Sequence, residues 1–162
     1  MEYLVLFLMG LFSSYCIINS EIITQFRHCA HSNCTITNLN INPCPEALYN
    51  KSCEIFLGNN VTITFDYFPY FNSQEPKVSL SKVKQLIDYP LLENYHDGCL
   101  YTSCPIQNNV LQKFKIEIKA TESVRMGVNR TKLRLWDSSH TRKTDDECCI
   151  YFSMKFVENT SI

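Results

Sequence analysis

The sequence predicts an all-β domain, folded as an antiparallel sandwich or barrel, in a protein that leaves the cytosol. Several segments alternate apolar with polar side chains, which is typical of strands that bury one face and expose the other. The 162 residues include nine cysteines and begin with a short apolar stretch. This length is enough for one domain with a sizeable core and too short for two ordinary domains.

Alternation with a period of two is clearest in four segments, which we expect to be strands. Their apolar positions are Val61, Ile63, Phe65 and Tyr67; Phe114, Ile116, Ile118 and Ala120; Val124, Met126 and Val128; and Ile150, Phe152, Met154 and Phe156. Turn-rich segments separate them, as in sandwiches and barrels. Leu133 and Leu135 follow the third segment on the opposite parity, so we expect a β-bulge near residues 129–131.

Two further segments allow alternative interpretations. Residues 81–88 contain an apolar pattern that could mark a short helix, and we favour a strand. Trp136 has the parity opposite to Leu133 and Leu135, so it lies either at an exposed sheet edge or turned inward by the bulge. We expect it to be partly buried.

The N-terminus has the features of a secretory leader. Residues 3–12 are almost all apolar, and about ten such residues fit the core of a signal peptide but not a membrane span of about 20. We expect residues 1–20 to be the signal peptide, with cleavage after Cys16 or Ser20; the alternative is a buried N-terminal strand. Residues 21–157 then form the domain and residues 158–162 a frayed tail. The expected location is extracellular, with the endolysosomal lumen as a second destination.

Cleavage removes Cys16 and leaves an even set of cysteines, which in a secreted chain indicates four disulfides. Two close pairs bracket short loops, and the other four cysteines are placed to tie the first strand to the last. Cys148 and Cys149 are adjacent, so they point to opposite faces of a strand and need different partners. The eight cysteines are Cys29, Cys34, Cys44, Cys53, Cys99, Cys104, Cys148 and Cys149.

A zinc site is the alternative for the first of these cysteines. Residues 28–34 contain His28, Cys29, His31 and Cys34, which superficially resemble zinc ligands. An oxidising compartment favours disulfides there, so we expect no metal.

N-glycosylation sequons support secretion. The expected sites are Asn50, Asn60, Asn129 and Asn159, while Asn33 is less suited because a cysteine expected to be bridged follows it.

Charge and motifs exclude other function classes. Lys and Arg number 15 against 16 Asp and Glu, without the basic excess of a nucleic-acid-binding protein. The four glycines are far apart and form no phosphate-binding loop. Ser138, Ser139 and His140 precede two aspartates in a charged hairpin, which is a weak candidate for a catalytic triad. We therefore expect no enzyme activity and no cofactor.

Four motifs together resemble the MD-2-related lipid-recognition (ML) family. They are Phe26-Arg27-His28-Cys29, Pro43-Cys44-Pro45, Asp97-Gly98-Cys99 and Cys104-Pro105-Ile106-Gln107. The resemblance covers roughly residues 21–157, and the last two motifs are its most specific part. Within the family the sequence is most similar to secreted sterol carriers of the Niemann-Pick type C kind and their arthropod relatives.

The resemblance implies an immunoglobulin-like sandwich of two antiparallel sheets, with a hydrophobic ligand between them and no catalysis. It also implies the disulfides Cys29–Cys149, Cys44–Cys53 and Cys99–Cys104. Cys34 and Cys148 are additional in this chain, and their pairing follows by elimination.

The expected ligand cavity is lined by inward-facing residues of the strands and of two loops. The candidates are Phe65, Tyr67, Val78, Leu80, Leu91, Phe114, Ile116, Ile118, Ala120, Val124, Met126, Leu133, Ile150 and Phe152. Against the family pattern, Leu91 stands in place of a phenylalanine, Val124-Arg125 in place of Tyr-Pro, and Leu133 in place of a tryptophan. Smaller aliphatic side chains indicate a wider cavity or one shaped for a flexible chain. The loops at residues 89–95 and 124–128 are expected to move when the ligand enters.

The resulting hypothesis is a secreted, monomeric, non-enzymatic lipid carrier for a sterol, a fatty acid or a semiochemical. A membrane receptor, or a donor or acceptor membrane, is a candidate partner. The first alternative is a recognition module that presents lipid or glycolipid to a receptor; the second is a disulfide-rich structural or venom-type protein with a filled core. Basic residues at the cavity mouth, such as Arg125 and Arg130, would favour an anionic lipid, whereas an entirely apolar mouth would favour a sterol.

Overall fold

The computed structural model describes residues 22–85, 87–92, 95–121, 124–139 and 146–158. The predicted signal peptide, the sequon at Asn159 and His140 lie outside the described residues. Within the described ranges, no helix is both long enough and apolar enough to cross a bilayer.

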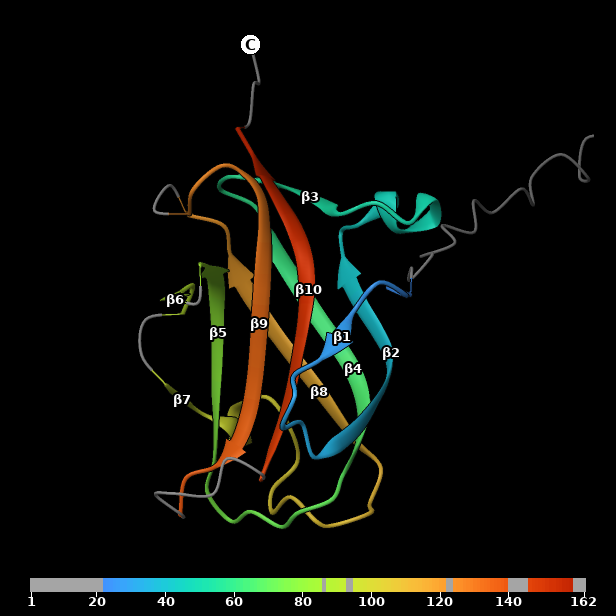
Figure 1. The fold of residues 1–162 in the computed structure, drawn as a ribbon, viewed down its shortest axis with the longest axis vertical. Helices are drawn as coiled ribbons and strands as arrows, with labels where there is room; N and C mark the ends of the chain where they lie inside the picture. Colours follow the sequence, from blue (N-terminus) through green and yellow to red (C-terminus); the bar gives the residue numbers. More distant parts are fainter. Residues whose placement is uncertain (1–21, 86, 93–94, 122–123, 140–145, 159–162) are drawn as a thin grey trace, which may run out of the picture.

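Two β-sheets lie face to face (Figure 1). The larger sheet has the order β1 (Arg27–His28), β10 (Glu147–Val157), β9 (Gly127–Asp137), β5 (Pro76–Lys84) and β6 (Ile87–Pro90); β3 (Cys53–Phe56) also pairs with β10, and β7 (His96–Asp97) with β5. The smaller sheet has the order β2 (Cys34–Asn42), β4 (Asn60–Pro69) and β8 (Gln112–Lys119). Two short 3-10 helices, η1 (Pro45–Tyr49) and η2 (Gly98–Leu100), lie in the connections. The pairing is antiparallel except between β3 and β10. The all-β sandwich expected from the alternation is confirmed.

The core lies between the sheets because each long strand turns its apolar residues inward. Strands β4, β8 and the C-terminal part of β10 bury the apolar positions predicted for them, and their intervening residues are partly or fully exposed. Antiparallel sheets with one buried and one solvent-exposed face produce this alternation. Three of the four predicted alternating segments are therefore confirmed.

The prediction for residues 124–131 is wrong. Strand β9 begins only at Gly127, whose φ is +95°, and its register with β10 is continuous from Gly127 to Trp136. Asn129 and Thr131 lie on the inner face together with Leu133. The alternation of inner and outer residues is therefore unbroken along β9, and no bulge is needed. The alternating apolar residues before it belong to a loop and to the solvent-facing start of the strand. The register shift that the structure does contain lies in β2, between Thr37 and Asn40.

The preference for a strand over a helix in residues 81–88 is confirmed. Strand β5 continues to Lys84, Gln85 has a positive φ of 49°, and β6 returns from Ile87 along β5. Trp136 lies on the outer face of β9 and is half-buried, as expected. The ring of Tyr95 packs edge-on against it at 5.2 Å.

Four disulfides hold the domain: Cys29–Cys149, Cys34–Cys148, Cys44–Cys53 and Cys99–Cys104. These are the expected pairs, and the zinc alternative is excluded because Cys29 and Cys34 are both bridged. Cys34–Cys148 joins β2 of the smaller sheet to β10 of the larger one. The first bridge and the third lie along the same edge of the sandwich, where β1, β2 and β3 meet β10 (Figure 1).

The two bridges to Cys148 and Cys149 should stabilise the domain non-additively. With one intact, the other closes only a short ring of residues 29–34 and 148–149, so removing either pair by Cys→Ala costs about 2.5 kcal/mol. Removing both frees a loop with a sequence separation of 114 or more and costs about 7 kcal/mol in total. Denaturant unfolding of the two double variants and the quadruple variant measures this. Strictly additive losses would contradict it.

Candidate functional site

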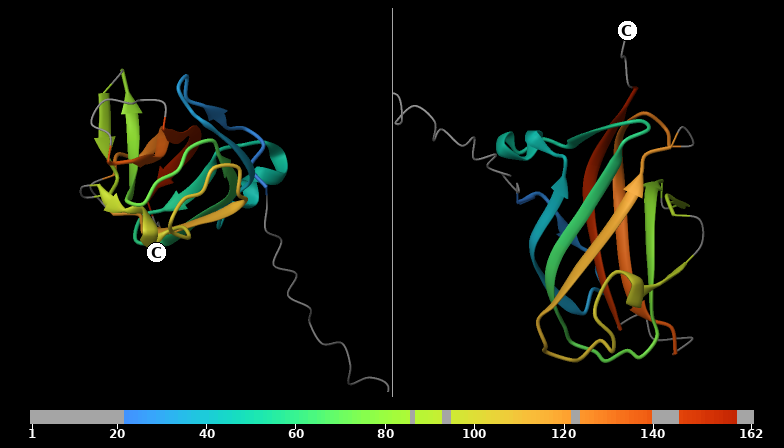
Figure 2. Two further views of the ribbon diagram at one scale, coloured as in Figure 1. Left: turned by 90° about the horizontal axis from the view of Figure 1, so that it is seen from below. Right: turned by 180° about the vertical axis from the view of Figure 1, so that it is seen from behind.

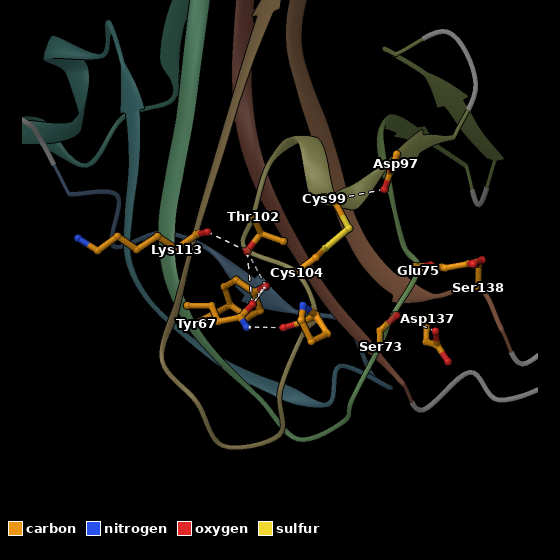
Figure 3. Close-up of a disulfide and its surroundings, with 12 residues drawn as sticks. Tyr67, Ser73, Glu75, Asp97, Cys99, Thr102, Cys104, Lys113, Asp137 and Ser138 are labelled. Atoms are coloured by element: carbon orange, nitrogen blue, oxygen red, sulfur yellow. Dashed lines mark hydrogen bonds between the residues drawn. A yellow bond between two sulfur atoms is a disulfide. The ribbon is translucent and has the colours of Figure 1, made fainter.

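One end of the sandwich is closed by a buried polar cluster (Figure 3). The hydroxyl of Tyr67 on β4 donates to Oε1 of Gln112 at 2.8 Å and lies 2.8 Å from Oγ1 of Thr102. Thr102 in turn donates to the carbonyl of Lys113, and Gln112 to that of Pro105. The disulfide Cys99–Cys104 braces the segment that carries Thr102. These contacts fix η2 and the following turn across this end of the interior.

The middle of the interior is aromatic. Phe65 on β4 stacks on Phe114 of β8 with ring centroids 4.6 Å apart, and Tyr67 meets Phe65 edge-on at 5.8 Å. Leu80 and Leu133 are paired in register across β5 and β9, and both are buried in the facing sheet. The middle of the two inner faces therefore forms one continuous apolar layer.

The opposite end of the sandwich is hollowed. A hollow of about 860 Å³ lies among the turn at Leu57 and Gly58, the end of β8 and the loop through Val124. Its other lining residues are Lys119, Ala120, Thr121, Arg125, Met126 and Glu158. A second hollow of about 290 Å³ shares Val124 and Arg125 with it. We call this end of the molecule, where β5 and β8 finish, the open end (Figure 2).

Three partly buried side chains, Leu57, Leu91 and Val124, lie between the hollows and the core and pack against it. Leu91 is held at the sheet edge by a hydrogen bond from its N–H to the carbonyl of Leu80 at 2.9 Å. The N–H of Val124 donates to the carbonyl of Thr121 at 3.0 Å. Displacing these side chains would expose the apolar interior at this end.

The structure divides the fourteen predicted lining residues between the core and the open end. Ten are buried between the sheets: Phe65, Tyr67, Val78, Leu80, Phe114, Ile116, Ile118, Leu133, Ile150 and Phe152. Leu91, Ala120 and Val124 lie where the core meets the open end. Met126 was expected to face inward from a strand, which is wrong: it lies in a loop, on the rim of the first hollow, and is 52% exposed.

The sequence prediction missed the basic residues that line the open end beside Arg125. Lys82 and Lys84 line the second hollow, and Lys119 lines the first. Extending the alternation of Val78 and Leu80 along β5 would have placed Lys82 and Lys84 on the inner face. Burial lowers the pKa of Lys82, and the positive charges of Arg125 and Lys84 lower it further.

Arg130 does not belong to this group, contrary to expectation. It faces outward from β9, and its guanidinium lies 4.1 Å from the ring centroid of Tyr151. Because residues alternate along β9, Arg130 lies on the outer face and does not line the open end.

The sequons differ in accessibility. Asn50 and Asn60 are exposed, as a glycan requires. Asn129 is only 4% exposed, and its amide nitrogen donates to the carbonyls of Arg125 and Gly127. The expectation of a glycan at Asn129 is therefore corrected, because the side chain faces the interior of the sandwich.

The family of this disulfide-braced, two-layered β-domain follows from comparison with known proteins. The family model of the ML domain matches residues 24–156, so this chain belongs to the ML domain family.

Two known proteins show the extent of the likeness. The MD-2-related lipid-recognition protein of Manduca sexta is 27% identical over 122 residues, which cover 75% of this chain and 76% of that protein. The crystal structure of a Niemann-Pick type C2 protein from the Japanese carpenter ant matches with a TM-score of 0.67 and 13% identity, over 82% of this chain and 98% of that chain. This structural likeness confirms the expected immunoglobulin-like fold.

Tyr67 should make the protein lose stability in alkali. Burial raises the pKa of its phenol from 10.0 to about 12, against a smaller opposing effect of the hydrogen bond with Thr102. Below pH 10 the phenol is protonated in both states and its contribution is complete. Between about pH 10 and 12 only the unfolded chain releases the proton, so about 3 kcal/mol of stability is lost.

Denaturant unfolding across this pH range tests the effect in Tyr67→Phe and in a control, Tyr70→Phe, whose ring is 47% exposed. Tyr67→Phe should lose stability less steeply with pH than the wild type, and Tyr70→Phe should follow the wild type. Equal slopes in all three proteins would show that Tyr67 titrates normally.

Proposed function

We propose that this protein is a secreted, non-enzymatic lipid carrier, which holds one hydrophobic ligand between its two sheets. The observation that carries the proposal is the pairing of an apolar interior with a hollowed end, where Leu57, Leu91 and Val124, among the described residues, lie between the hollows and the core. Membership of the ML domain family supports it, as do the printed names of the two relatives, a lipid-recognition protein and a Niemann-Pick type C2 protein.

Burial of apolar surface supplies enough free energy for such binding. A ligand that loses about 500 Å² of apolar surface to the interior gains roughly 12 kcal/mol at about 25 cal/mol per Å². Association costs several kcal/mol of this gain in lost translational and rotational freedom. Sub-micromolar affinity therefore requires no charged contact, and a flexible acyl chain or a sterol could each supply the area.

Uptake requires the two layers to part at the open end. The stacked rings of Phe65 and Phe114 fill the middle of the interior, so a ligand must displace side chains as well as the cover of Leu91 and Val124. The loop that contains Val124 and the segment after β6 are the parts of the chain that would move. Cys34–Cys148 holds the sheets together at the edge of β2 and β10 while this happens.

Secretion is part of the proposal. Four disulfides form and persist in oxidising compartments, and the apolar N-terminal stretch has the length of a signal-peptide core. We propose that the carrier works as a monomer and exchanges its ligand with a membrane or a membrane receptor.

Native mass spectrometry of the secreted protein, followed by lipid extraction, tests the proposal. We expect a bound lipid of one copy per chain, and displacement of a fluorescent fatty acid or sterol analogue from the purified protein. Val124→Glu should weaken binding by about tenfold or more, because a carboxylate beside the apolar path must be desolvated when the ligand enters.

The matched control is Val110→Glu, since Val110 is 44% exposed, precedes β8 by two residues near Gln112 of the closed end, and should tolerate the charge without loss of affinity. Recovery of no lipid, together with no displacement of either analogue, would refute the carrier function. An equal loss of affinity in the two variants would refute the assignment of the opening.

A further inference from the structure

A polar row crosses the inner face of the larger sheet at the open end. Lys82 on β5 is paired in register with Thr131 on β9, and Thr131 is paired with Phe152 on β10. Directly opposite residues of an antiparallel pair project to the same face, with Cβ atoms about 4.5–5.5 Å apart. The next row inward is Leu80, Leu133 and Ile150, which are all buried. Lys82 therefore lines the second hollow, and Thr131 lies beside it on the same face, with the buried Asn129 and Met154 one row further toward the open end.

The hydroxyl of Thr131 has no partner in this arrangement. The residue is 0% exposed, and its Oγ1 makes no hydrogen bond within the described part of the chain. At least nine in ten buried polar groups in native proteins are hydrogen-bonded, and an unpaired one is costly. Such a hydroxyl can pair with a polar atom that a ligand brings into the interior.

Lys82 brings positive charge to the same place, and no ion pair to it is found within the described residues. In that part of the chain, the second hollow is lined by Lys82, Lys84 and Arg125 together with Tyr89, Pro90, Leu91 and Val124, without an acidic side chain. On the outer face the neighbouring cations are neutralised: Lys132 binds Asp88 at 2.9 Å, and Arg134 binds Glu147 at 2.6 Å. The lowered pKa of Lys82, caused by burial and by Arg125 and Lys84, agrees with a cation that lacks a counter-ion.

We propose that Lys82 and Thr131 bind the carboxylate of a single-chain fatty acid, whose acyl chain lies along Leu80, Leu133 and Ile150. The ammonium of Lys82 donates to one carboxylate oxygen and the Thr131 hydroxyl to the other. This inference rests on the proposed carrier function and specifies its ligand class. A neutral sterol hydroxyl could pair with Thr131, but it would give Lys82, Lys84 and Arg125 no counter-ion beyond what the described residues offer them.

The test compares a long-chain fatty acid with the primary alcohol of the same chain, by displacement of a fluorescent probe. The wild type should bind the acid about tenfold or more tightly than the alcohol, because charge-assisted hydrogen bonds are roughly twice as strong as neutral ones. Lys82→Met should abolish this preference by weakening the acid alone. Lys115→Met, on the exposed outer face of β8, is the charge-matched control and should keep it.

Thr131→Val gives a second readout that does not depend on charge. Replacing an unpaired buried hydroxyl by a methyl of the same shape should raise the melting temperature of the ligand-free protein by about 2–5 °C. The same variant should bind the fatty acid several-fold more weakly. A lower melting temperature with unchanged affinity would show that the hydroxyl is paired in solution and would overturn its role.

A second unpaired buried atom, Nε2 of His96, distinguishes the two ends of the interior. His96 is paired with Val78 on β5 and contacts the ring of Tyr101, so it lies toward the closed end. If His96→Phe abolishes the preference for the acid and Lys82→Met does not, the headgroup binds at the closed end and the proposal is wrong. Equal binding of acid and alcohol would also overturn it while leaving the carrier function intact. Failure of both ligands and of sterol to bind would instead refute the carrier function itself.

Discussion

The covalent attachment of the two sheets along one edge is the constraint on which the rest of the structure depends. Cys34–Cys148 joins β2 to β10 directly, and Cys29–Cys149 and Cys44–Cys53 reinforce the same edge. On the opposite edge, none of the four bridges joins β5 to β8, and the backbone hydrogen bonds between Ser73 and Ile106 connect the segments that precede these strands. A sandwich joined in this way can separate at its free edge and still keep its topology, which a uniformly packed core would resist.

The two ends of the sandwich differ in how their buried polar groups are paired. At the closed end, the hydrogen bonds of Tyr67, Thr102 and Gln112 satisfy buried polar groups and hold η2 in place. At the open end, Thr131 and Lys82 are left without comparable partners within the described residues. A satisfied polar network rigidifies a core, whereas an unsatisfied one carries a cost that a ligand can relieve. In the proposed carrier, the positive charge of Lys82 beside the Thr131 hydroxyl sets the direction of the ligand, because the unpaired Nε2 of His96 toward the closed end has no such cation on the same row.

The sequence predicted the fold more completely than the site. Strands β4, β8 and β10 were predicted correctly because each buries its apolar face against the other sheet. The disulfide pairs were predicted from the cysteine pattern together with the family resemblance. The pattern misled where apolar residues alternate in a loop, as at Met126, although Gly127 marks the start of β9. Lys82 was missed because a charged residue is ordinarily expected on the outer face, although the alternation of Val78 and Leu80 continues to it on the inner face. Only the register of β5 on β9 shows that it faces Thr131.

Nuclear Overhauser contacts between an isotope-labelled protein and an unlabelled fatty acid measure most directly whether the ligand lies between the sheets. The account predicts contacts from the acyl chain to the methyl groups of Leu80, Leu133 and Ile150, which are each at most 1% exposed in the described structure. It predicts none to the outward-facing methyl groups of Val110 and Val128. Contacts confined to those outer methyl groups would place the lipid on the surface and contradict the account.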